Sequence, residues 1–386
     1  MKHYFSKKHP GIDLWIVGTT LALMCFGLIM VGSASLDVSS VRYDNPLRMI
    51  RNWVFYMPLG LLIIVVVSHI DIQKVKSYSV PILFVMMIIM SLLLIIGHET
   101  NGATRWYSIM GFSFQPVELF KPALILYMAF FISSNPEKLR TFKHGILPML
   151  VVLSGGLTLL MLQPDFGNTM LLLSSCFCLW LVGGIPVRHL FLLIALTIPA
   201  IGAAVIFEPY RMLRLVSFID PWADPYSSGY QLIQSMLAFG VGGIQGTGLG
   251  QGIQKLFYLP EASTDFIAAV IAEELGLLGI FLLIALFAIL IWRGFRICLR
   301  SKEMFERLMA LGCTLLIAIS AIINMGVVMG LFPTKGMPLP FISYGGSALI
   351  GNSILIGILL GISRQQALAS TAAGKPVKKS RAQSHA

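Results

Sequence analysis

Charged side chains are rare in this chain: Asp, Glu, Lys and Arg make up 12% of its 386 residues, whereas 56% of the residues are hydrophobic. The mean hydropathy is +0.83. Soluble globular domains carry about 25% charged residues, so this composition excludes a water-soluble enzyme. The net charge of +11 is explained below by membrane orientation, and we expect no nucleic-acid binding from it.

Cysteine is also scarce, and every cysteine lies within an apolar run or beside Arg residues that we expect to be cytoplasmic. Disulfides are not expected in such places, so the chain is not a disulfide scaffold. Long apolar segments are the dominant feature of the sequence. The five cysteines are Cys25, Cys176, Cys178, Cys298 and Cys313.

Ten apolar stretches are long enough, or nearly so, to cross a hydrocarbon core of about 30 Å, which takes about 20 helical residues. The sequence therefore predicts an all-α, polytopic membrane protein with ten transmembrane helices in a single membrane domain, residues 1–364. Residues 365–386, rich in Ala, Ser and Lys, are predicted to form a disordered basic cytoplasmic tail. The predicted spans are 12–35, 52–68, 78–97, 116–133, 145–163, 167–184, 189–207, 266–292, 308–331 and 347–363.

The distribution of Lys and Arg orients these spans, because cytoplasmic loops are enriched in basic residues. With the N-terminus inside, 19 of the 28 Lys and Arg residues fall on the cytoplasmic side, but only five of the 17 acids do. Ten crossings place both termini in the cytoplasm. They also make residues 207–264, between the seventh and eighth helices, one long extracytoplasmic loop.

This long loop ends on an acid, Asp265, where the eighth apolar stretch begins. A carboxyl group at such a border is partly withdrawn from water, which makes its pKa tunable. Glu118, Lys121, Asp165 and Glu274 lie in the same outer half of the membrane domain, and the first two are three residues apart on a helix and can pair. Charges within membrane segments are costly and usually functional, so the pattern predicts a polar cavity that opens outward.

Two segments of the long loop carry a local pattern. Residues 229–239 place Leu232, Ile233, Met236 and Leu237 on one helical face, which predicts a short amphipathic helix in the membrane interface. Glycine then recurs at nearly every second position over 240–252. Such a segment can bring backbone N–H groups close to an anionic ligand or can serve as a flexible hinge, and the sequence leaves both interpretations open.

Several cations lie on the predicted outer side. Arg211 and Arg214, one helical turn apart, and Lys255 flank the glycine-rich segment and suit a diphosphate ligand, with pairing to nearby acids as the simpler alternative. Arg105 and Trp106 lie in an earlier outer loop. Trp106 has the alternative role of an interfacial aromatic residue, whereas Arg105 is on the side that the orientation rule makes poor in cations.

Eight short motifs are distributed along the chain: Gln163–Gly167, Pro221–Trp222, Gly229–Leu232, Gly246–Gly250, Lys255–Glu261, Thr264–Ile267, Ala272–Gly276 and Pro338–Gly346. Taken together, they resemble the SEDS (shape, elongation, division, sporulation) family of membrane proteins. The resemblance extends from the first helix to Arg364. Residues 255–259 and 330–336 are more similar to the cell-division branch, FtsW and SpoVE, than to the rod-elongation branch, RodA.

The resemblance implies a peptidoglycan glycosyltransferase that polymerises lipid II at the outer face of the cytoplasmic membrane during cell division, with Asp265 as the essential acid. Transfer from a polyprenyl-diphosphate donor needs one general base for the acceptor hydroxyl, because a diphosphate leaves as a stabilised anion. We therefore assign Asp265 as this base. The candidate substrate contacts are Arg105, Trp106, Glu118, Lys121, Arg211, Arg214 and Lys255, with Asp165 and Glu274 as supporting residues.

No organic cofactor is expected, and Asp165 and Glu274 are alternatively a pair of ligands for a divalent cation. The resemblance implies lipid II, the nascent glycan strand, a class B penicillin-binding transpeptidase and other divisome proteins as partners, at the division septum. Two other functions stay open. A lipid II flippase would need a polar path to the inner leaflet, and a non-catalytic divisome scaffold would use Asp265 only to order the loop.

Overall fold

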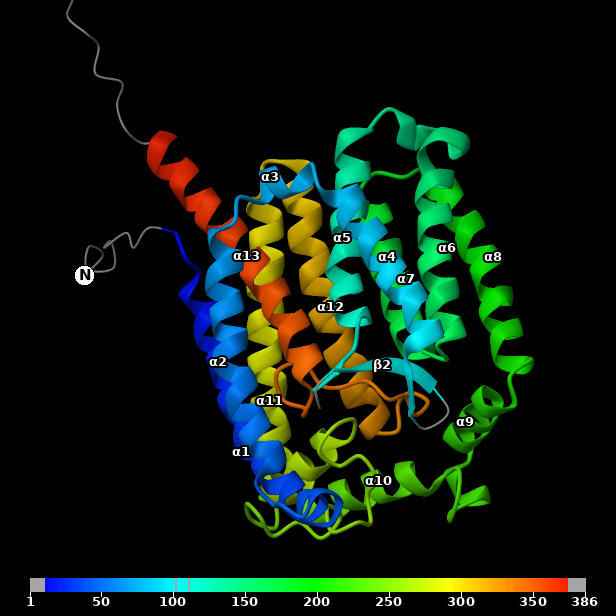
Figure 1. Cartoon of the computed structure of the whole chain (residues 1–386), viewed down its shortest axis with the longest axis vertical. Coiled ribbons are helices and arrows are strands. Elements are labelled where there is room, and N and C mark those ends of the chain that lie inside the picture. Colours follow the sequence, from blue (N-terminus) through cyan, green and yellow to red (C-terminus); the bar gives the residue numbers. More distant parts are fainter. Residues whose placement is uncertain (1–10, 101–102, 110–111, 374–386) are drawn as a thin grey trace, which may run out of the picture.

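Long helices aligned along one axis make up most of the computed structural model, which describes residues 11–100, 103–109 and 112–373 (Figure 1). Ten of these helices coincide with the predicted spans. They are α1 (Leu14–Tyr43), α2 (Arg48–His69), α4 (Ser79–Ile96), α5 (Val117–Ser134), α6 (Leu147–Leu162), α7 (Phe166–Val182), α8 (Val187–Ile206), α11 (Ile267–Arg300), α12 (Met304–Val328) and α13 (Gly346–Ala373).

Nine helices within the described residues are long and apolar enough to cross a membrane, which confirms a multi-pass membrane protein. The remaining predicted span, α7, has 17 residues and is shorter than these. Short turns at 163–165 and 183–186 join α7 to α6 and α8, as is usual for antiparallel neighbours. The tenth crossing, by α7, therefore stays a prediction that its connections support.

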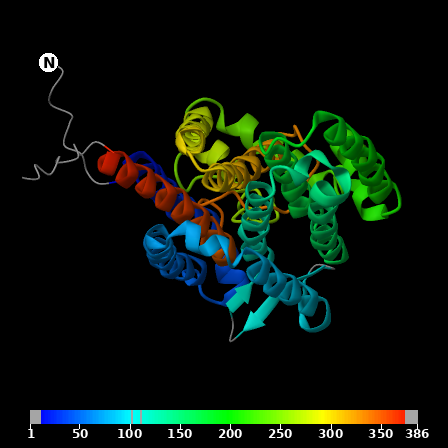
Figure 2. The ribbon, with the colours of Figure 1, turned by 90° about the horizontal axis from the view of Figure 1, so that it is seen from above.

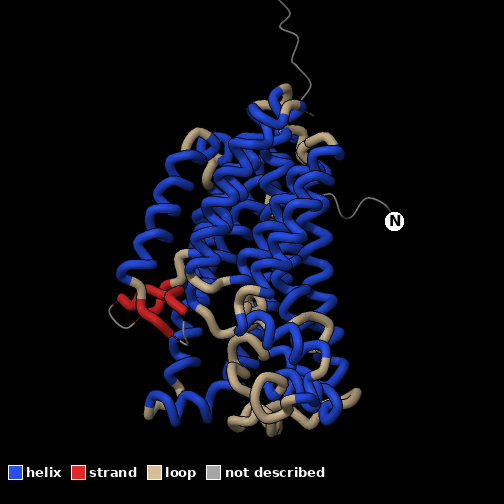
Figure 3. The backbone as a smooth tube through the Cα atoms, turned by 90° about the vertical axis from the view of Figure 1, so that its right-hand side faces the viewer, coloured by secondary structure: helices blue, strands red, loops and turns tan. Residues whose placement is uncertain are grey.

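The polar segments gather at the two ends of the bundle. One end carries the short helices α3 (Ile72–Lys76), η1 (Lys138–Arg140) and η2 (Phe142–Ile146), together with both described ends of the chain (Figure 1). We call the other end the loop end; it consists of residues 97–100, 103–109, 112–116, 163–165, 207–266 and 329–345. Figure 3 shows the strands and most of the irregular chain there. The orientation rule predicts that the loop end lies outside the cell.

The core of the bundle lies among α5, α12 and α13. Between 72% and 78% of the span residues of these three helices are buried, whereas only 11% of α8 and 17% of α2 are. Seen along the bundle axis, α8 lies at the edge away from α13 (Figure 2). Exposed apolar side chains on such peripheral helices suit contact with lipid rather than with water.

A small sheet at the loop end qualifies the all-α prediction. Strands β1 (His98–Thr100), β2 (Ala103–Ile109) and β3 (Phe112–Phe114) pair antiparallel in the order β1-β2-β3. Thr, Trp, Tyr and Ile, which are common in strands, fill much of β2. The sequence analysis treated this segment only as a loop, because it lies between two much stronger apolar signals.

The long extracytoplasmic loop also contains helices: α9 (Pro209–Ile219), η3 (Pro221–Ala223) and α10 (Tyr230–Gly242). The amphipathic helix predicted for 229–239 is confirmed as α10, which packs against α11 and in which Leu232 and Ile233 are buried. Its faces differ slightly from the prediction. Ser235 is buried and donates a hydrogen bond to the Val328 carbonyl at 2.7 Å, whereas Leu237 is 44% exposed.

The predicted disordered tail is wrong for residues 365–373, because α13 continues to Ala373. Side chains beyond the apolar stretch hold this extension in place. Gln365 Nε2 donates to Asp71 Oδ1 at 3.0 Å, and Gln366 Nε2 donates to Ser301 Oγ at 2.8 Å. Residues 374–386 lie outside the described residues.

The orientation can be tested by labelling single added cysteines in intact cells. Ser227, in the loop end, and Lys302, in the turn between α11 and α12, are both exposed. A membrane-impermeant maleimide should label Ser227→Cys in intact cells and should label Lys302→Cys only after the membrane is opened. The unmodified chain measures the background from its five native cysteines. Protection of Ser227→Cys with labelling of Lys302→Cys would show the opposite orientation.

Candidate functional site

Asp265 lies at the loop end, directly before α11, and its backbone is tied to the chain between α12 and α13. The buried Asn324 side chain on α12 donates hydrogen bonds from Nδ2 to the Asp265 carbonyl at 2.8 Å and to the Met337 carbonyl at 2.7 Å. The Ser343 hydroxyl donates to the Thr264 carbonyl. These bonds satisfy backbone groups in a poorly hydrated region and hold the acid at a defined position.

The Asp265 carboxylate lies against a glycine. A methyl group added at Gly336 would come within 2.9 Å of Asp265 Oδ2. The Asp265 side chain is partly buried, and no hydrogen bond or ion pair found among the described residues ends on its carboxylate oxygens. The carboxylate therefore has both oxygens available to a ligand.

The surroundings raise the pKa of Asp265 to about 7, first through desolvation and then through the negative charge of Glu261. Arg214 and Arg105 lower this pKa, and the charge of Asp165 raises it. A carboxyl group with a pKa near neutrality is present in a substantial ionised fraction at physiological pH and still accepts a proton readily. This combination is what a general base requires.

Arg105, on β2, holds the turn before α7. Its Nε donates to the Gln163 carbonyl at 3.1 Å, and its guanidinium also donates to the Pro164 carbonyl. Asp165, the next residue in this turn, is buried and caps α7 by accepting hydrogen bonds from Asn168, at 3.1 Å from the backbone N–H and 2.8 Å from Nδ2. The turn is thus held from both sides.

Arg211 and Arg214 lie on α9 and face the same region. Arg211 donates to the Ala204 carbonyl at 2.8 Å, and its guanidinium carbon lies 5.7 Å from the centre of the Phe166 ring. Arg214 donates to the Thr334 carbonyl at 3.1 Å. Among the described residues, no ion pair involves either arginine, so the simpler alternative of pairing with nearby acids is wrong for both. Their remaining N–H groups can bind an anion.

A further cation, Lys335, lies beside Arg211 and was not among the predicted site residues. Its ammonium nitrogen lies 5.3 Å from the centre of the same Phe166 ring. Desolvation and the positive charge of Arg214 lower the pKa of Lys335 to about 8, although Asp165 acts in the opposite direction. Its position on the predicted outer side, where cations are few, was the sequence feature that could have identified Lys335 as a site residue.

Glu118 and Lys121 form the predicted pair. Lys121 Nζ lies 2.7 Å from Glu118 Oε2, and both side chains are buried on α5. Gly351 of α13 lies so close that a methyl group there would come within 2.8 Å of the Glu118 carbonyl. No contact in the described residues joins this pair to Asp265. Its role in substrate binding stays a prediction.

Trp106 lies between two residues of β2 that face the bundle. Tyr107 donates its hydroxyl to the Ile89 carbonyl at 2.8 Å, while Arg105 contacts the turn before α7. Trp106 is partly buried. Its role in substrate binding, and the alternative of an interfacial aromatic residue, are both still predictions.

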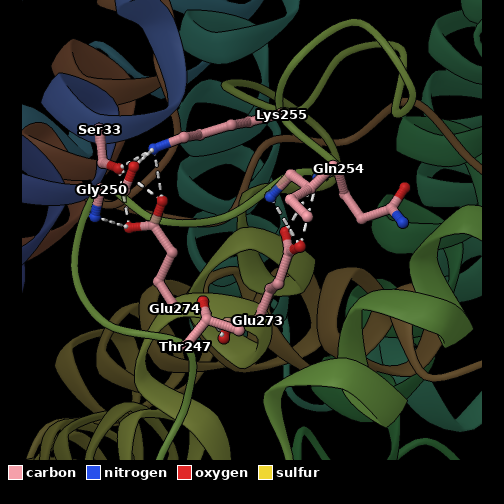
Figure 4. Close-up of polar contacts among 8 residues, drawn as sticks. Ser33, Thr247, Gly250, Gln254, Lys255, Glu273 and Glu274 are labelled. Carbon is pink, nitrogen blue, oxygen red and sulfur yellow. Dashed lines mark hydrogen bonds and ion pairs between the residues drawn. The ribbon is translucent and has the colours of Figure 1, made fainter.

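Lys255 is not a contact for an outer ligand, which corrects the sequence analysis. This lysine is 5% exposed, and its ammonium group has three acceptors: Glu274 Oε1 at 2.6 Å, Ser33 Oγ at 2.8 Å and the Gly250 carbonyl at 2.9 Å. An ammonium group has three N–H donors, so none remains for a diphosphate. Figure 4 shows Lys255 directed at Glu274 and Ser33.

The glycine-rich segment binds anions, but these anions are the chain's own carboxylates. The Gly250 N–H donates to Glu274 Oε2 at 3.0 Å. The N–H groups of Ile253 and Gln254 donate to Glu273, at 2.8 Å and 3.1 Å (Figure 4). Both glutamates are buried. The segment is therefore neither a free hinge nor a cradle for an outer ligand.

This arrangement depends on a break in α11 at Gly276, where φ is 63° and ψ is −161°. The carbonyl of Glu273, freed by the break, accepts from the Thr247 N–H at 2.9 Å, and the N–H of Leu277 donates to the Gly243 carbonyl at 3.0 Å. The glycine-rich segment thus replaces helical hydrogen bonds where water is scarce.

Asp165 and Glu274 do not form a joint metal site. Asp165 is engaged with Asn168, whereas Glu274 is engaged with Lys255 and Ser33. The described residues contain no group of three or more His, Cys, Asp or Glu side chains arranged to hold a metal ion. In the Glu274 cluster, the Lys255 ammonium already supplies the positive charge that a cation would bring.

The fold and the site together define a polytopic membrane protein with a poised carboxylate and unpaired cations at one end of its helical bundle. The chain belongs to the FtsW/RodA/SpoVE family of cell cycle proteins, whose model matches residues 14–368. This confirms the resemblance seen in the sequence motifs.

Two relatives illustrate the branch of the family. The chain is 41% identical over 359 residues to the probable peptidoglycan glycosyltransferase FtsW of Geobacter metallireducens, covering 92% of this chain and 96% of the relative. It is 37% identical over 361 residues to stage V sporulation protein E of Bacillus subtilis, covering 93% and 99%.

Two solved structures have the same fold. One is a peptidoglycan synthase complex that coordinates polymerization and crosslinking; it is 27% identical, with a TM-score of 0.77 over 94% of this chain and 99% of that chain. The other is the rod shape determining protein RodA of Thermus thermophilus, 25% identical, with a TM-score of 0.69 over 92% and 97%.

The break at Gly276 gives a direct test of the loop-end architecture. Gly276→Ala should lower the free energy of unfolding by about 1 to 3 kcal/mol from backbone strain alone, and further because the added methyl group would come within 2.4 Å of the Gly246 nitrogen. Thermal unfolding in detergent measures the change. Gly240→Ala, in α10, is the matched control, since its methyl group would meet no atom within 4 Å. Equal midpoints for the two variants would contradict this interpretation.

Proposed function

We propose that this chain is a peptidoglycan glycosyltransferase that polymerises lipid II into glycan strands at the outer face of the cytoplasmic membrane, at the division septum. The observation that carries the proposal is Asp265: its carboxylate has a pKa of about 7, and among the described residues it has no hydrogen-bond or ion-pair partner and the cations near it pair with no acid. The similarity to proteins named peptidoglycan glycosyltransferase supports the same activity.

In the proposed reaction, Asp265 takes the proton of the acceptor's 4-hydroxyl as that oxygen attacks the anomeric carbon of the donor. A bond forms between these two atoms, and the bond from the anomeric carbon to the diphosphate oxygen breaks. The electron pair of the broken bond leaves with the diphosphate. One carboxylate suffices, because the leaving group needs electrostatic stabilisation rather than a proton.

The two arginines of α9, Arg211 and Arg214, suit the negative charge that develops on this leaving group. Arg211 and Arg214 each use one N–H group on a backbone carbonyl, which fixes the guanidinium without consuming its charge. Such pre-positioned donors stabilise charge more effectively than flexible ones, since they need not reorganise during the reaction. Arg105 adds further positive charge near Asp265.

The proposed partners follow from the reaction and from the similar complex. Lipid II and the nascent glycan strand are the substrates. A class B penicillin-binding transpeptidase with a single span is the proposed protein partner, since the similar synthase complex coordinates polymerization with crosslinking. Other divisome proteins would bring this pair to the septum.

The base assignment is tested by polymerisation of purified lipid II by this chain with its transpeptidase partner. Asp265→Asn should lower the rate by about 10²- to 10⁴-fold, because it removes general base catalysis while keeping the side chain's shape. Asp44→Asn is the matched control: Asp44 is exposed, and its left-handed backbone, with φ of 55°, tolerates Asn. Polymer from well-folded Asp265→Asn at the normal rate would refute the base. No polymer from the unmutated complex would favour the flippase or the scaffold.

The raised pKa also predicts the pH dependence of polymerisation. The base acts when deprotonated, so the rate should be lost as the pH falls through about 7 and should level off above it. Glu261 raises the pKa of Asp265, so Glu261→Gln should shift the midpoint to lower pH without abolishing turnover. A rate that is flat between about pH 5 and 7 would contradict the assignment.

A further inference from the structure

An apolar cleft of about 530 Å³ lies between α7, α8 and α12 and ends at Lys335. Lys335 is the single charged residue among those that line it. Several of the walls are open toward the surrounding membrane: Ile198 is 64% exposed and Ile322 is 53% exposed. The lining includes Leu173, Phe177, Ile198, Ile319, Ile322 and Phe332. A cleft with these walls and one cation at its end matches a lipid with an anionic headgroup.

The segment of residues 334–336 connects this cleft with the proposed base. The Thr334 carbonyl accepts a hydrogen bond from Arg214 at 3.1 Å. Lys335 itself faces the cleft and the Phe166 ring. Gly336, the next residue, touches the Asp265 carboxylate. Residues 334–336 therefore run from the Arg214 contact, past the cation of the cleft, to the glycine that lies against the Asp265 carboxylate.

In the part of the chain that the structure describes, the charge of Lys335 is not used in any ion pair. No hydrogen bond or ion pair involving its ammonium group occurs among the described residues. This distinguishes Lys335 from Lys255, whose three donors are all bound, and from Lys121, which is paired with Glu118. Desolvation is the main cause of its lowered pKa, about 8, and it outweighs the opposing charge of Asp165.

Reaction geometry identifies which lipid diphosphate this cation would meet. The general base must reach the 4-hydroxyl as it attacks the anomeric carbon, and that carbon is bonded directly to the donor's diphosphate. The acceptor's diphosphate lies at the far end of its disaccharide, two sugar rings from the attacking hydroxyl. Lys335 directly precedes the glycine that lies against the base, so this cation is nearer to the donor's diphosphate than to the acceptor's.

We infer that Lys335 contacts the leaving diphosphate of the lipid-linked donor, whose isoprenoid chain occupies the cleft between α7, α8 and α12. This inference rests on the proposed function and deepens it. When the bond from the anomeric carbon breaks, its electron pair goes to the diphosphate oxygen, and the Lys335 ammonium donates a hydrogen bond to that anion without giving up its proton. The acceptor's proton ends on Asp265. The acceptor lipid would bind to a separate surface of the protein.

Polymerisation kinetics with separated substrates test the cation. Lipid II with a blocked 4-hydroxyl acts only as a donor, so kcat and KM can be measured for donor and acceptor independently. Lys335→Gln should reduce kcat/KM for the donor by about 10- to 150-fold, the loss of one charge-assisted contact. The acceptor KM should change less than about twofold, and Lys335→Arg should restore most of the rate. Normal donor kinetics in Lys335→Gln, or a raised acceptor KM instead, would overturn the assignment.

The cleft is tested by filling it. Ile198→Trp places an indole in the cleft and should raise the KM of a long-chain donor, while a donor with a short isoprenoid chain should be unaffected. Leu196→Trp is the matched control on the same helix, because Leu196 is 61% exposed and does not line the cleft. Equal effects of the two variants, or equal effects on both donors, would show that the chain lies elsewhere.

A binding measurement separates this inference from the proposed function. Undecaprenyl diphosphate should bind the unmutated protein in detergent, about 10-fold more weakly in Lys335→Gln, and phosphatidylglycerol should not compete. Equal competition would mean a general phospholipid site and would refute the donor assignment. Weakened binding in Lys335→Gln without any polymer from the unmutated complex would mean that the site is a lipid-diphosphate site of a non-polymerising protein. Polymer with normal binding in Lys335→Gln would refute only the inference.

Discussion

The break in α11 is the constraint on which the rest of the loop end depends. A helix that stops at Gly276 and restarts leaves backbone groups without partners, and at membrane depth each unpaired group costs several kcal/mol. The glycine-rich segment supplies those partners, because its backbone pairs with Glu273 and Leu277. The Glu274 carboxylate then accepts from the Gly250 N–H, and the Glu273 carboxylate accepts from the N–H groups of Ile253 and Gln254, just after the segment. The start of α11, and with it Asp265, is positioned by this exchange of hydrogen bonds.

Two groups of cations at the loop end differ in what surrounds them. Lys255 is buried against Glu274, and removing either partner would leave an uncompensated buried charge, so the pair orders the loop. Arg211, Arg214 and Lys335 have no acid within ion-pair distance among the described residues. In the absence of substrate, this positive charge without an ion-pair partner lowers the stability of the folded protein. It becomes favourable when an anionic substrate binds.

Much of this could be predicted from local sequence patterns. The apolar stretches located the membrane helices, and the spacing in residues 229–239 located α10, since both signals depend only on neighbouring residues. Asp265 was identifiable because an acid at the start of an apolar helix is unusual. Lys255 was misassigned and Lys335 was missed for the same reason: whether a lysine meets a glutamate or an open cleft depends on residues far away in the chain. The helical extension of α13 was missed because contacts with Asp71 and Ser301, rather than apolar periodicity, hold it in place.

The sequence by itself determined the class of the protein, its approximate spans, its predicted orientation and its proposed base, because hydropathy, charge and local motifs act over a few residues. Only the tertiary structure decided what each charge does. Lys255, from the long loop, meets Glu274 of α11 and Ser33 of α1, whereas Lys335 meets a cleft formed by three other helices. The strength of a charge interaction in a low-dielectric interior depends on distance and burial, and these are set by packing between distant segments.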